Sequence, residues 1–258
     1  MAAESLLAAE VFIQVAACLR REPCPPMGDS FEEWLFWRVP AIEHYRSSRE
    51  GVAKVEIPRA ESRFDVILWQ SLLEHPDLVL EHETTCLGVE CKSLEASPQF
   101  VATRNGVPCR TTIDFNSTVP CGKEFFKGKS SRYAHLRGQP ITVFYALCLY
   151  GEVEGEMRLL SFLMMDGNYI NRDHTLHQEH RNISRRGFGS YGDGSIRERK
   201  MYLFPNPLTD PDLVGGVALV AEQEDLTAVF PQLMLVMQKV RRASAGGAFP
   251  FFVYRLRE

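Results

Sequence analysis

Two long apolar segments joined by a short polar connection constrain the fold of this chain more than any other feature. Residues 141–150 and 157–165 are mostly apolar, and the connection between them, 151–156, is polar and contains two glycines. Apolar runs of this length, separated by turn-forming residues, predict two β-strands of one hairpin. A β-sheet is therefore the expected centre of the fold, and a chain of 258 residues is long enough to bury it.

The remaining periodicity places helices before the first strands and mixed elements after them. Apolar residues spaced by three and four from Leu6 to Leu19 predict an amphipathic helix over 4–21. Ser30 and Glu33 form a capping-box pattern, which predicts a helix over 31–38. This order of elements indicates one domain of the α/β or α+β class over 1–258. The other expected elements are helices over 61–74 and 226–242, strands over 77–82, 88–94, 111–115 and 217–221, a turn over 83–86, an edge strand over 249–256 and an irregular segment over 181–200.

The composition is that of a globular protein and limits the partners that the chain can bind. Hydrophobic residues make up 45% of the chain and charged residues 24%, which excludes a disordered chain or a fibre. Because the net charge is −4, any nucleic-acid-binding surface must be a local concentration of positive charge. The seven cysteines are odd in number and form no CxxC pair, which argues against a disulfide framework and a thiolate zinc site, so we expect a cytoplasmic protein. No uncharged apolar stretch reaches about 18 residues, so no membrane partner is expected.

The pattern Pro76-Asp77 … Glu90-Cys91-Lys92 carries the chemistry of the chain. Because side chains alternate along a strand, Glu90 and Lys92 are expected on one face and Cys91 on the other. Asp77 opens the preceding strand, and the turn between the strands can bring it beside Glu90. Two adjacent carboxylates repel each other unless a cation is present, and Mg²⁺ prefers oxygen ligands. The pattern therefore predicts a Mg²⁺ site at which Lys92 orients or helps to deprotonate a water molecule that attacks a phosphate.

These residues resemble the signature of the PD-(D/E)XK nuclease superfamily, and Glu90-Cys91-Lys92 resembles the form found in type II restriction endonucleases. The resemblance implies an α/β fold with a restriction-endonuclease-like core, in which a central mixed β-sheet is flanked by helices. It divides the chain into N-terminal helices over 1–74, a catalytic hairpin over 76–94, and later strands and DNA-contacting loops over 95–258. It also implies Asp77, Glu90 and Lys92 as catalytic residues, and Asp77, Glu90 and the main-chain carbonyl of Cys91 as ligands of the Mg²⁺ cofactor.

Two assignments around this motif have structural alternatives. A further metal-binding carboxylate often comes from the helix before the aspartate in this superfamily, and Glu33 is the candidate, with Glu32 and Glu43 behind it. Glu33 could instead only cap its own helix. In the same way, Glu90 and Lys92 could form an exposed ion pair on an edge strand, which would contribute little.

Two basic segments are the expected DNA-contacting surfaces, with a solvated protein surface as the alternative. Segment 181–200 contains six cationic side chains and two acidic ones, interleaved with glycines and with Phe188 and Tyr191. A second basic group follows the polar residues after the strand expected over 111–115. Both segments suit phosphate contacts and arginine–guanine recognition. The candidate DNA-binding residues are Asn116, Ser117, Thr118, Lys123, Lys127, Lys129, Arg132, Arg181, Arg185, Arg186, Arg197, Arg199 and Lys200.

The expected partner is double-stranded DNA, and the expected assembly is a homodimer. Cutting both strands of a palindromic site favours two-fold symmetry, because the symmetry of the protein then matches that of the site. The interpretation is a type II restriction endonuclease of a restriction-modification system. Its alternatives are a repair-nicking or transposase-type nuclease of the same superfamily, and a catalytically inactive DNA-binding protein.

Overall fold

The computed structural model describes parts of the chain, among them the strands of a central sheet and one long helix. The described residues are 3–21, 65–67, 78–82, 85–95, 101–104, 107–110, 113–114, 135–136, 139–140, 142–169, 200–201, 210, 212–242 and 247–258. Among them, no helix is both long enough and apolar enough to cross a membrane.

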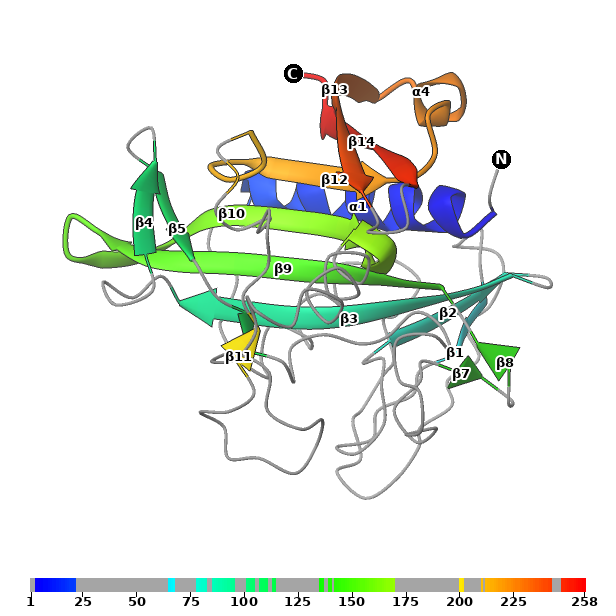
Figure 1. Ribbon diagram of the computed structural model, residues 1–258, viewed down its shortest axis with the longest axis horizontal. Coiled ribbons are helices and arrows are strands. Elements are labelled where there is room, and N and C mark those ends of the chain that lie inside the picture. The colour runs from blue at the N-terminus through cyan, green and yellow to red at the C-terminus, as the bar shows by residue number, and fades with distance from the viewer. Residues whose placement is uncertain are drawn as a thin grey trace.

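An eight-stranded mixed sheet forms the centre of the fold (Figure 1). The β3–β9 and β10–β12 pairs are parallel, and the other neighbouring pairs are antiparallel. The fold is therefore of the α/β class in general, as the sequence predicts. In order across the sheet, the strands are β1 (Asp65–Ile67), β2 (Leu78–His82), β3 (Thr85–Glu95), β9 (Thr142–Val153), β10 (Glu156–Asp166), β12 (Val217–Ala221), β14 (Ala248–Leu256) and β13 (Leu233–Arg242).

Three small two-stranded sheets lie outside the central sheet. Each consists of two short antiparallel strands. They pair β4 (Val101–Arg104) with β5 (Val107–Arg110), β6 (Ile113–Asp114) with β11 (Lys200–Met201), and β7 (His135–Leu136) with β8 (Gln139–Pro140).

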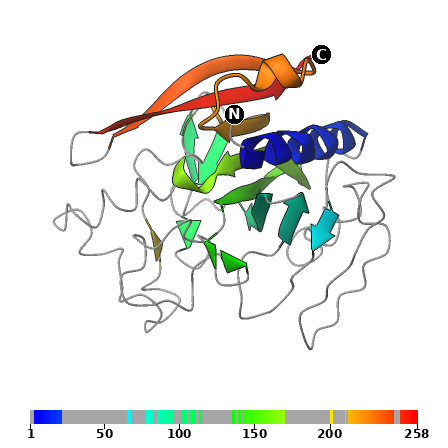
Figure 2. The same cartoon turned by 90° about the vertical axis from the view of Figure 1, so that its right-hand side faces the viewer.

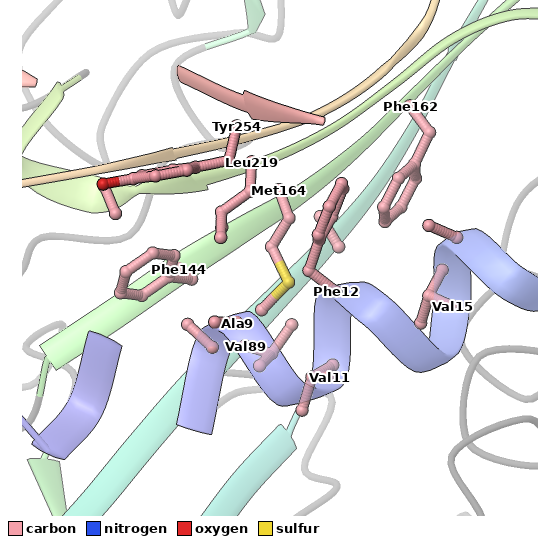
Figure 3. Packing of buried hydrophobic residues seen from close by; sticks show 14 of the residues in the cluster. Ala9, Val11, Phe12, Val15, Val89, Phe144, Phe162, Met164, Leu219 and Tyr254 are labelled. Atoms are coloured by element: carbon pink, nitrogen blue, oxygen red, sulfur yellow. The ribbon is translucent and has the colours of Figure 1, made fainter. Parts of the chain in front are cut away.

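Helix α1 (Ala3–Arg21) covers one face of the central sheet and confirms the helix expected over 4–21. Figure 2 shows α1 lying between the central strands and the β13–β14 ribbon, which arches over it. The apolar stripe of the helix contributes Val11, Phe12 and Val15 to a core shared with β3, β9, β10, β12 and β14. Figure 3 shows Phe12 directed from the helix toward Met164 and Phe162 of β10. Burial of this stripe accounts for the position of the helix, because packing supplies most of the stability of a helix in a protein.

The middle of the sheet is buried on both faces. Every residue of β9 from Val143 to Tyr150 is buried, although alternate side chains point to opposite faces. Strands that are covered on both sides read as continuous apolar runs instead of alternating ones. This burial explains why the two apolar segments were so prominent in the sequence.

The two expected hairpins are confirmed, with different limits for their turns. β2 and β3 pair antiparallel, and Thr85 and Cys86 belong to β3 and not to the turn expected over 83–86. β9 and β10 also pair antiparallel, and their strands extend until only Glu154 and Gly155 separate them. Both of these residues have a positive φ, 55° and 82°. A two-residue connection of this kind matches the right-handed twist of the strands that it joins.

This turn allows a matched pair of stability measurements. Glu154→Asn is expected to raise the free energy of unfolding by about 0.5–1 kcal/mol, because asparagine adopts positive φ more readily than glutamate. Gly155→Ala is expected to lower the free energy of unfolding by about 1–2 kcal/mol, because the Cβ of alanine is sterically disfavoured in this backbone conformation. A Cβ at Gly155 would meet no atom within 4 Å, so the loss would be conformational and not a clash. Urea unfolding of both variants checks the signs, and equal effects would contradict the turn geometry.

Two expected helices are wrong where the structure describes them. Within 61–74, Asp65–Ile67 forms β1 and pairs with β2, so the segment over 1–74 is not all helical. Its short apolar run fits either a helix or a buried strand, and pairing with β2 decides in favour of the strand. Within 226–242, only Leu226–Val229 is helical (α4), and Leu233–Arg242 is β13. Pro231 separates the two, because proline lacks the N–H that a continuing helix needs.

Two strands near the C-terminal end lie where the sequence predicts them, but the position of one of them in the sheet differs from the expectation. The strand expected over 217–221 is confirmed as β12, and that over 249–256 is confirmed as β14. However, β14 lies between β12 and β13, so the edge position expected for it is wrong and belongs to β13. The strand expected over 111–115 is confirmed in part as β6, but β6 pairs with β11 and not with the central sheet. Lys200, expected in an irregular segment, begins β11, and the helix expected over 31–38 lies outside the described residues.

The pH dependence of stability can test the buried position of Tyr254 on β14. Its side chain is fully buried, and its hydroxyl lies 2.5 Å from the carbonyl oxygens of both Gln223 and Glu224. Burial, together with the charges of Asp225 and Glu224, raises the pKa of Tyr254 to about 12, against the opposing effect of a backbone hydrogen bond at Leu226.

The folded state therefore holds the Tyr254 proton at a pH where the unfolded chain has released it. This stabilisation is present below the unfolded pKa of about 10 and is lost as the pH rises toward 12. We expect the parent to lose stability over this range more steeply than Tyr254→Phe, measured by urea unfolding at several pH values. Parallel profiles for the two proteins would contradict the assignment.

Candidate functional site

The second half of the sequence motif lies on β3, in the interior of the central sheet. Alternation along this strand divides its residues as predicted: Val89 and Cys91 join the core under α1, and Glu90 and Lys92 occupy the opposite face. In the register of the sheet, Glu90 is the cross-strand neighbour of Tyr145 on β9, and Tyr145 is in turn paired with Met165 on β10. Glu90 is therefore the charged member of a row of large buried side chains.

Glu90 and Lys92 form a close ion pair on this face. Nζ of Lys92 lies 2.6 Å from Oε1 of Glu90, and the exposed fractions of the two side chains are 22% and 0%. Burying a carboxylate costs free energy unless a positive group or hydrogen bonds compensate it. The pair is thus not the exposed ion pair of an edge strand that the sequence left as an alternative.

The ladder between β2 and β3 places the motif at a defined point of the sheet. The described pairing of these strands runs from His82 opposite Thr85 to Leu78 opposite Val89. β3 continues beyond this pairing to Glu95, with β9 as its neighbour on the other side. Glu90 is therefore the first residue of β3 beyond its described pairing with β2. It lies in the middle of β3.

The donor chemistry of this part of β3 suits a hard cation. The carboxylate of Glu90 and the main-chain carbonyl of Cys91 are oxygen donors of the kind that Mg²⁺ prefers. The ammonium group of Lys92 already stands at one carboxylate oxygen, so the position accommodates a positive charge. Within the described part of the chain, however, no group of three or more His, Cys, Asp and Glu side chains could hold a metal ion. A Mg²⁺ site here would therefore need further ligands from outside the described residues, where the candidate Asp77 lies.

Most of the other candidate residues lie outside the described residues. This holds for the candidate metal ligand Asp77, for the candidate carboxylate Glu33, and for the DNA-binding candidates with the exception of Lys200. The candidates concerned are Asn116, Ser117, Thr118, Lys123, Lys127, Lys129, Arg132, Arg181, Arg185, Arg186, Arg197 and Arg199.

The pairing of β6 with β11 joins a residue just before the first candidate DNA-binding segment to the last residue of the second. Strand β6 ends at Asp114, shortly before the first segment begins at Asn116, and β11 begins at Lys200, where the second segment ends. The two strands pair antiparallel, with Lys200 opposite Asp114 and Met201 opposite Ile113. The backbone therefore places Asp114, just before the first segment, opposite Lys200, the last residue of the second.

The structure adds buried polar residues that the sequence did not single out. Arg241 of β13 is almost fully buried, and its guanidinium carbon lies 3.7 Å from the centre of the Tyr169 ring. Tyr169 in turn meets Phe251 of β14 edge to face, with ring centres 5.0 Å apart. The sequence analysis missed this cluster because it expected a helix over 226–242, and in a helix Arg241 would have no strand neighbours. Tyr145 was missed because it is one aromatic residue within a continuous apolar run.

Comparison of the chain with known protein families, with curated proteins and with solved structures finds no match.

Proposed function

We propose that this chain is a type II restriction endonuclease, which cleaves both strands of a short DNA site by Mg²⁺-dependent hydrolysis of phosphodiester bonds. The observation that carries the proposal is the buried Glu90 carboxylate beside the Lys92 ammonium on a strand of a mixed sheet. A charged pair in a row of apolar side chains is costly to keep for stability alone. Buried charged groups of this kind are often found at functional sites.

The position of the first half of the motif supports the same proposal. Asp77 precedes Leu78 in the sequence, and Leu78 is paired with Val89, the residue before Glu90. The proposal requires only that this antiparallel register continues by one residue, which would set Asp77 opposite Glu90. The order of elements, with α1 before the hairpin and further strands after it, agrees with the restriction-endonuclease-like core that the motif implies.

The proposed chemistry assigns a role to each residue of the motif. Asp77, Glu90 and the Cys91 carbonyl would hold Mg²⁺, with Glu33 as a candidate further ligand. When bound, Mg²⁺ offsets the negative charge that builds on the phosphate in the transition state. Glu90 is held rigidly for this role, because its strand is paired with β9 and its side chain is fully buried. Lys92, which is partly exposed, would orient the attacking water and, once its ammonium group has released a proton to solvent, would accept the proton of that water.

The proposed partner is double-stranded DNA, bound by a cytoplasmic homodimer. The β6–β11 pairing supports a common surface for the two basic segments, because it joins their ends. Arginine and lysine side chains of these segments would contact phosphates and base edges on both sides of the scissile bond. Two such surfaces related by a two-fold axis would read a palindromic site.

Digestion of a plasmid of known sequence tests the proposal. Purified protein with Mg²⁺ is expected to give discrete fragments, and EDTA or Asp77→Ala is expected to abolish them. If only nicked circles formed, the result would favour a repair-type nuclease of the same superfamily over a restriction endonuclease. Binding without any cleavage, measured by mobility shift with and without Mg²⁺, would identify a catalytically inactive DNA-binding protein. Cleavage by Asp77→Ala at the rate of the parent would overturn the metal site.

A further inference from the structure

Exposed large hydrophobic side chains of the described residues are concentrated in one short segment. Six such side chains are exposed, and five of them lie between residues 229 and 240. Three are consecutive on β13: Met234, Leu235 and Val236 have exposed fractions of 45%, 40% and 38%. Scattered apolar residues on a surface are ordinary, but a contiguous group indicates an interaction surface.

These side chains lie on the edge strand of the central sheet. In the described part of the sheet β13 is the terminal strand, with β14 as its neighbour (Figure 1). An edge strand presents backbone N–H and C=O groups that can pair with another strand. The register with β14 shifts between Leu235 and Met237, so Val236 is the extra residue of a bulge within the apolar triplet.

Two charged side chains of this edge strand are engaged within the chain. Nζ of Lys239 lies 2.9 Å from Oδ2 of Asp210 and 2.5 Å from Oδ2 of Asp212. Burial lowers the pKa of Lys239, but the hydrogen bonds and charges of the two carboxylates outweigh this effect and raise it overall. Arg241 is buried against Tyr169. The triplet Met234, Leu235 and Val236 carries no charge, so two copies of it would meet without like-charge repulsion, whereas a strongly charged partner strand would find no countercharge there.

We propose that β13 pairs antiparallel with β13 of a second copy of this chain, about a two-fold axis at Leu235. In this register Leu235 lies opposite Leu235 of the second copy, and Met234 lies opposite Val236 of the second copy. The apolar triplet of each copy covers that of the other, and the ends that carry Lys239 and Arg241 diverge from the axis. A two-fold pairing closes on itself, so it covers both edges without forming a fibre. The pairing gives the homodimer of the proposed function its interface and in that respect rests on it. Because the dimer is measured without DNA or Mg²⁺, its failure would leave the proposed cleavage standing.

Sedimentation of the full chain without DNA or Mg²⁺ tests the pairing. The parent is expected to sediment as a dimer, and Leu235→Lys as a monomer with an unchanged circular dichroism spectrum. Two lysines would then oppose each other at the axis, which is expected to weaken association on the order of 100-fold or more. Met157→Lys is the matched control, because Met157 is equally exposed, at 42%, but lies beside the β9–β10 turn. This control is expected to remain a dimer.

A charge exchange tests the register itself. Leu235→Lys and Leu235→Glu are each expected to be monomeric, and their equimolar mixture is expected to recover the dimer, because residue 235 then opposes an unlike charge. A monomeric parent at all concentrations would overturn the proposal, and so would a dimer that survives Leu235→Lys. Failure of the mixture to associate would overturn the register at Leu235. If Leu235→Lys does not fold, Leu235→Gln in the same measurement decides, with a weaker dimer expected.

Discussion

Replacing Lys92 by alanine is expected to lower Mg²⁺-dependent DNA cleavage by roughly 10²–10⁴-fold, the usual contribution of a positioned proton-transfer group. Lys92 is the partly exposed member of the pair on β3, so it can face substrate while Glu90 stays buried. The measurement is the initial rate of plasmid cleavage at saturating Mg²⁺. Arg158→Ala is the control, because Arg158 forms an exposed ion pair with Glu156 at the end of the β9–β10 hairpin. This control is expected to cleave at the rate of the parent.

A conservative variant separates the catalytic role of Lys92 from its structural role. Lys92→Arg keeps a positive charge beside Glu90, so the free energy of unfolding is expected to stay close to that of the parent. Arginine cannot release a proton at neutral pH, so cleavage is still expected to be lost. If Lys92→Arg and Lys92→Ala both cleaved at the parental rate, the ion pair would be purely structural and the nuclease assignment would fall.

The same site predicts a link between stability and Mg²⁺. Removing the ammonium group leaves the buried Glu90 carboxylate with less compensation, and Lys92→Ala is expected to lower the free energy of unfolding by about 1–3 kcal/mol. Mg²⁺ that binds only the folded state should restore part of this loss. Thermal unfolding with and without Mg²⁺ measures the effect. The double variant Glu90→Gln/Lys92→Ala lacks the carboxylate, so a Mg²⁺-dependent rise in its melting temperature equal to that of Lys92→Ala would contradict the role of Glu90.

Truncating Phe12 to alanine is expected to lower the free energy of unfolding by about 3–5 kcal/mol. Phe12 has no exposed surface, and it lies where α1 meets Phe162 and Met164 of β10 (Figure 3). The loss combines the removed apolar contacts with a cavity that the surrounding strands cannot fill. It is a large share of the 5–15 kcal/mol that typically stabilises a domain. Urea unfolding followed by circular dichroism gives the value.

Two further variants show whether this loss belongs to the interface between helix and sheet. Phe12→Leu keeps most of the apolar volume, so its loss is expected to be smaller than that of Phe12→Ala. Met157→Ala truncates a side chain that is 42% exposed, and its effect is expected to stay within about 0.5 kcal/mol. A Phe12→Ala variant as stable as Met157→Ala would show that α1 does not pack on the sheet at this residue.

The parts of the fold that depend on local pattern could be predicted from the sequence. Helix α1 follows from the spacing of residues such as Val11 and Val15, and the β9–β10 hairpin follows from two apolar runs around a glycine-containing turn. β1 and β13 could not be predicted in the same way, because their apolar residues fit both a helix and a strand. Long-range pairing with β2 and β14 decides these cases, and pairing partners far along the chain leave no local signal.

The candidate site was predictable to the extent that it lies on one strand. Alternation alone placed Glu90 and Lys92 on one face, and the structure confirms this and adds their separation of 2.6 Å. The complete burial of the Glu90 side chain was not predictable, because it results from β9 lying beside β3. The parallel register between these strands also sets Tyr145 beside Glu90, and no spacing in the sequence indicates that contact.

The parallel pairing of β3 with β9 has a consequence for the time course of folding. The strand that carries Glu90 and Lys92 can form a hairpin with β2 as soon as both have been synthesised, since these strands are neighbours in the chain. Its other neighbour, β9, is translated much later and must close a long loop before it can dock. The nascent chain would therefore carry Glu90 and Lys92 on a half-built sheet, and the proposed hydrolytic activity would arise only late in maturation.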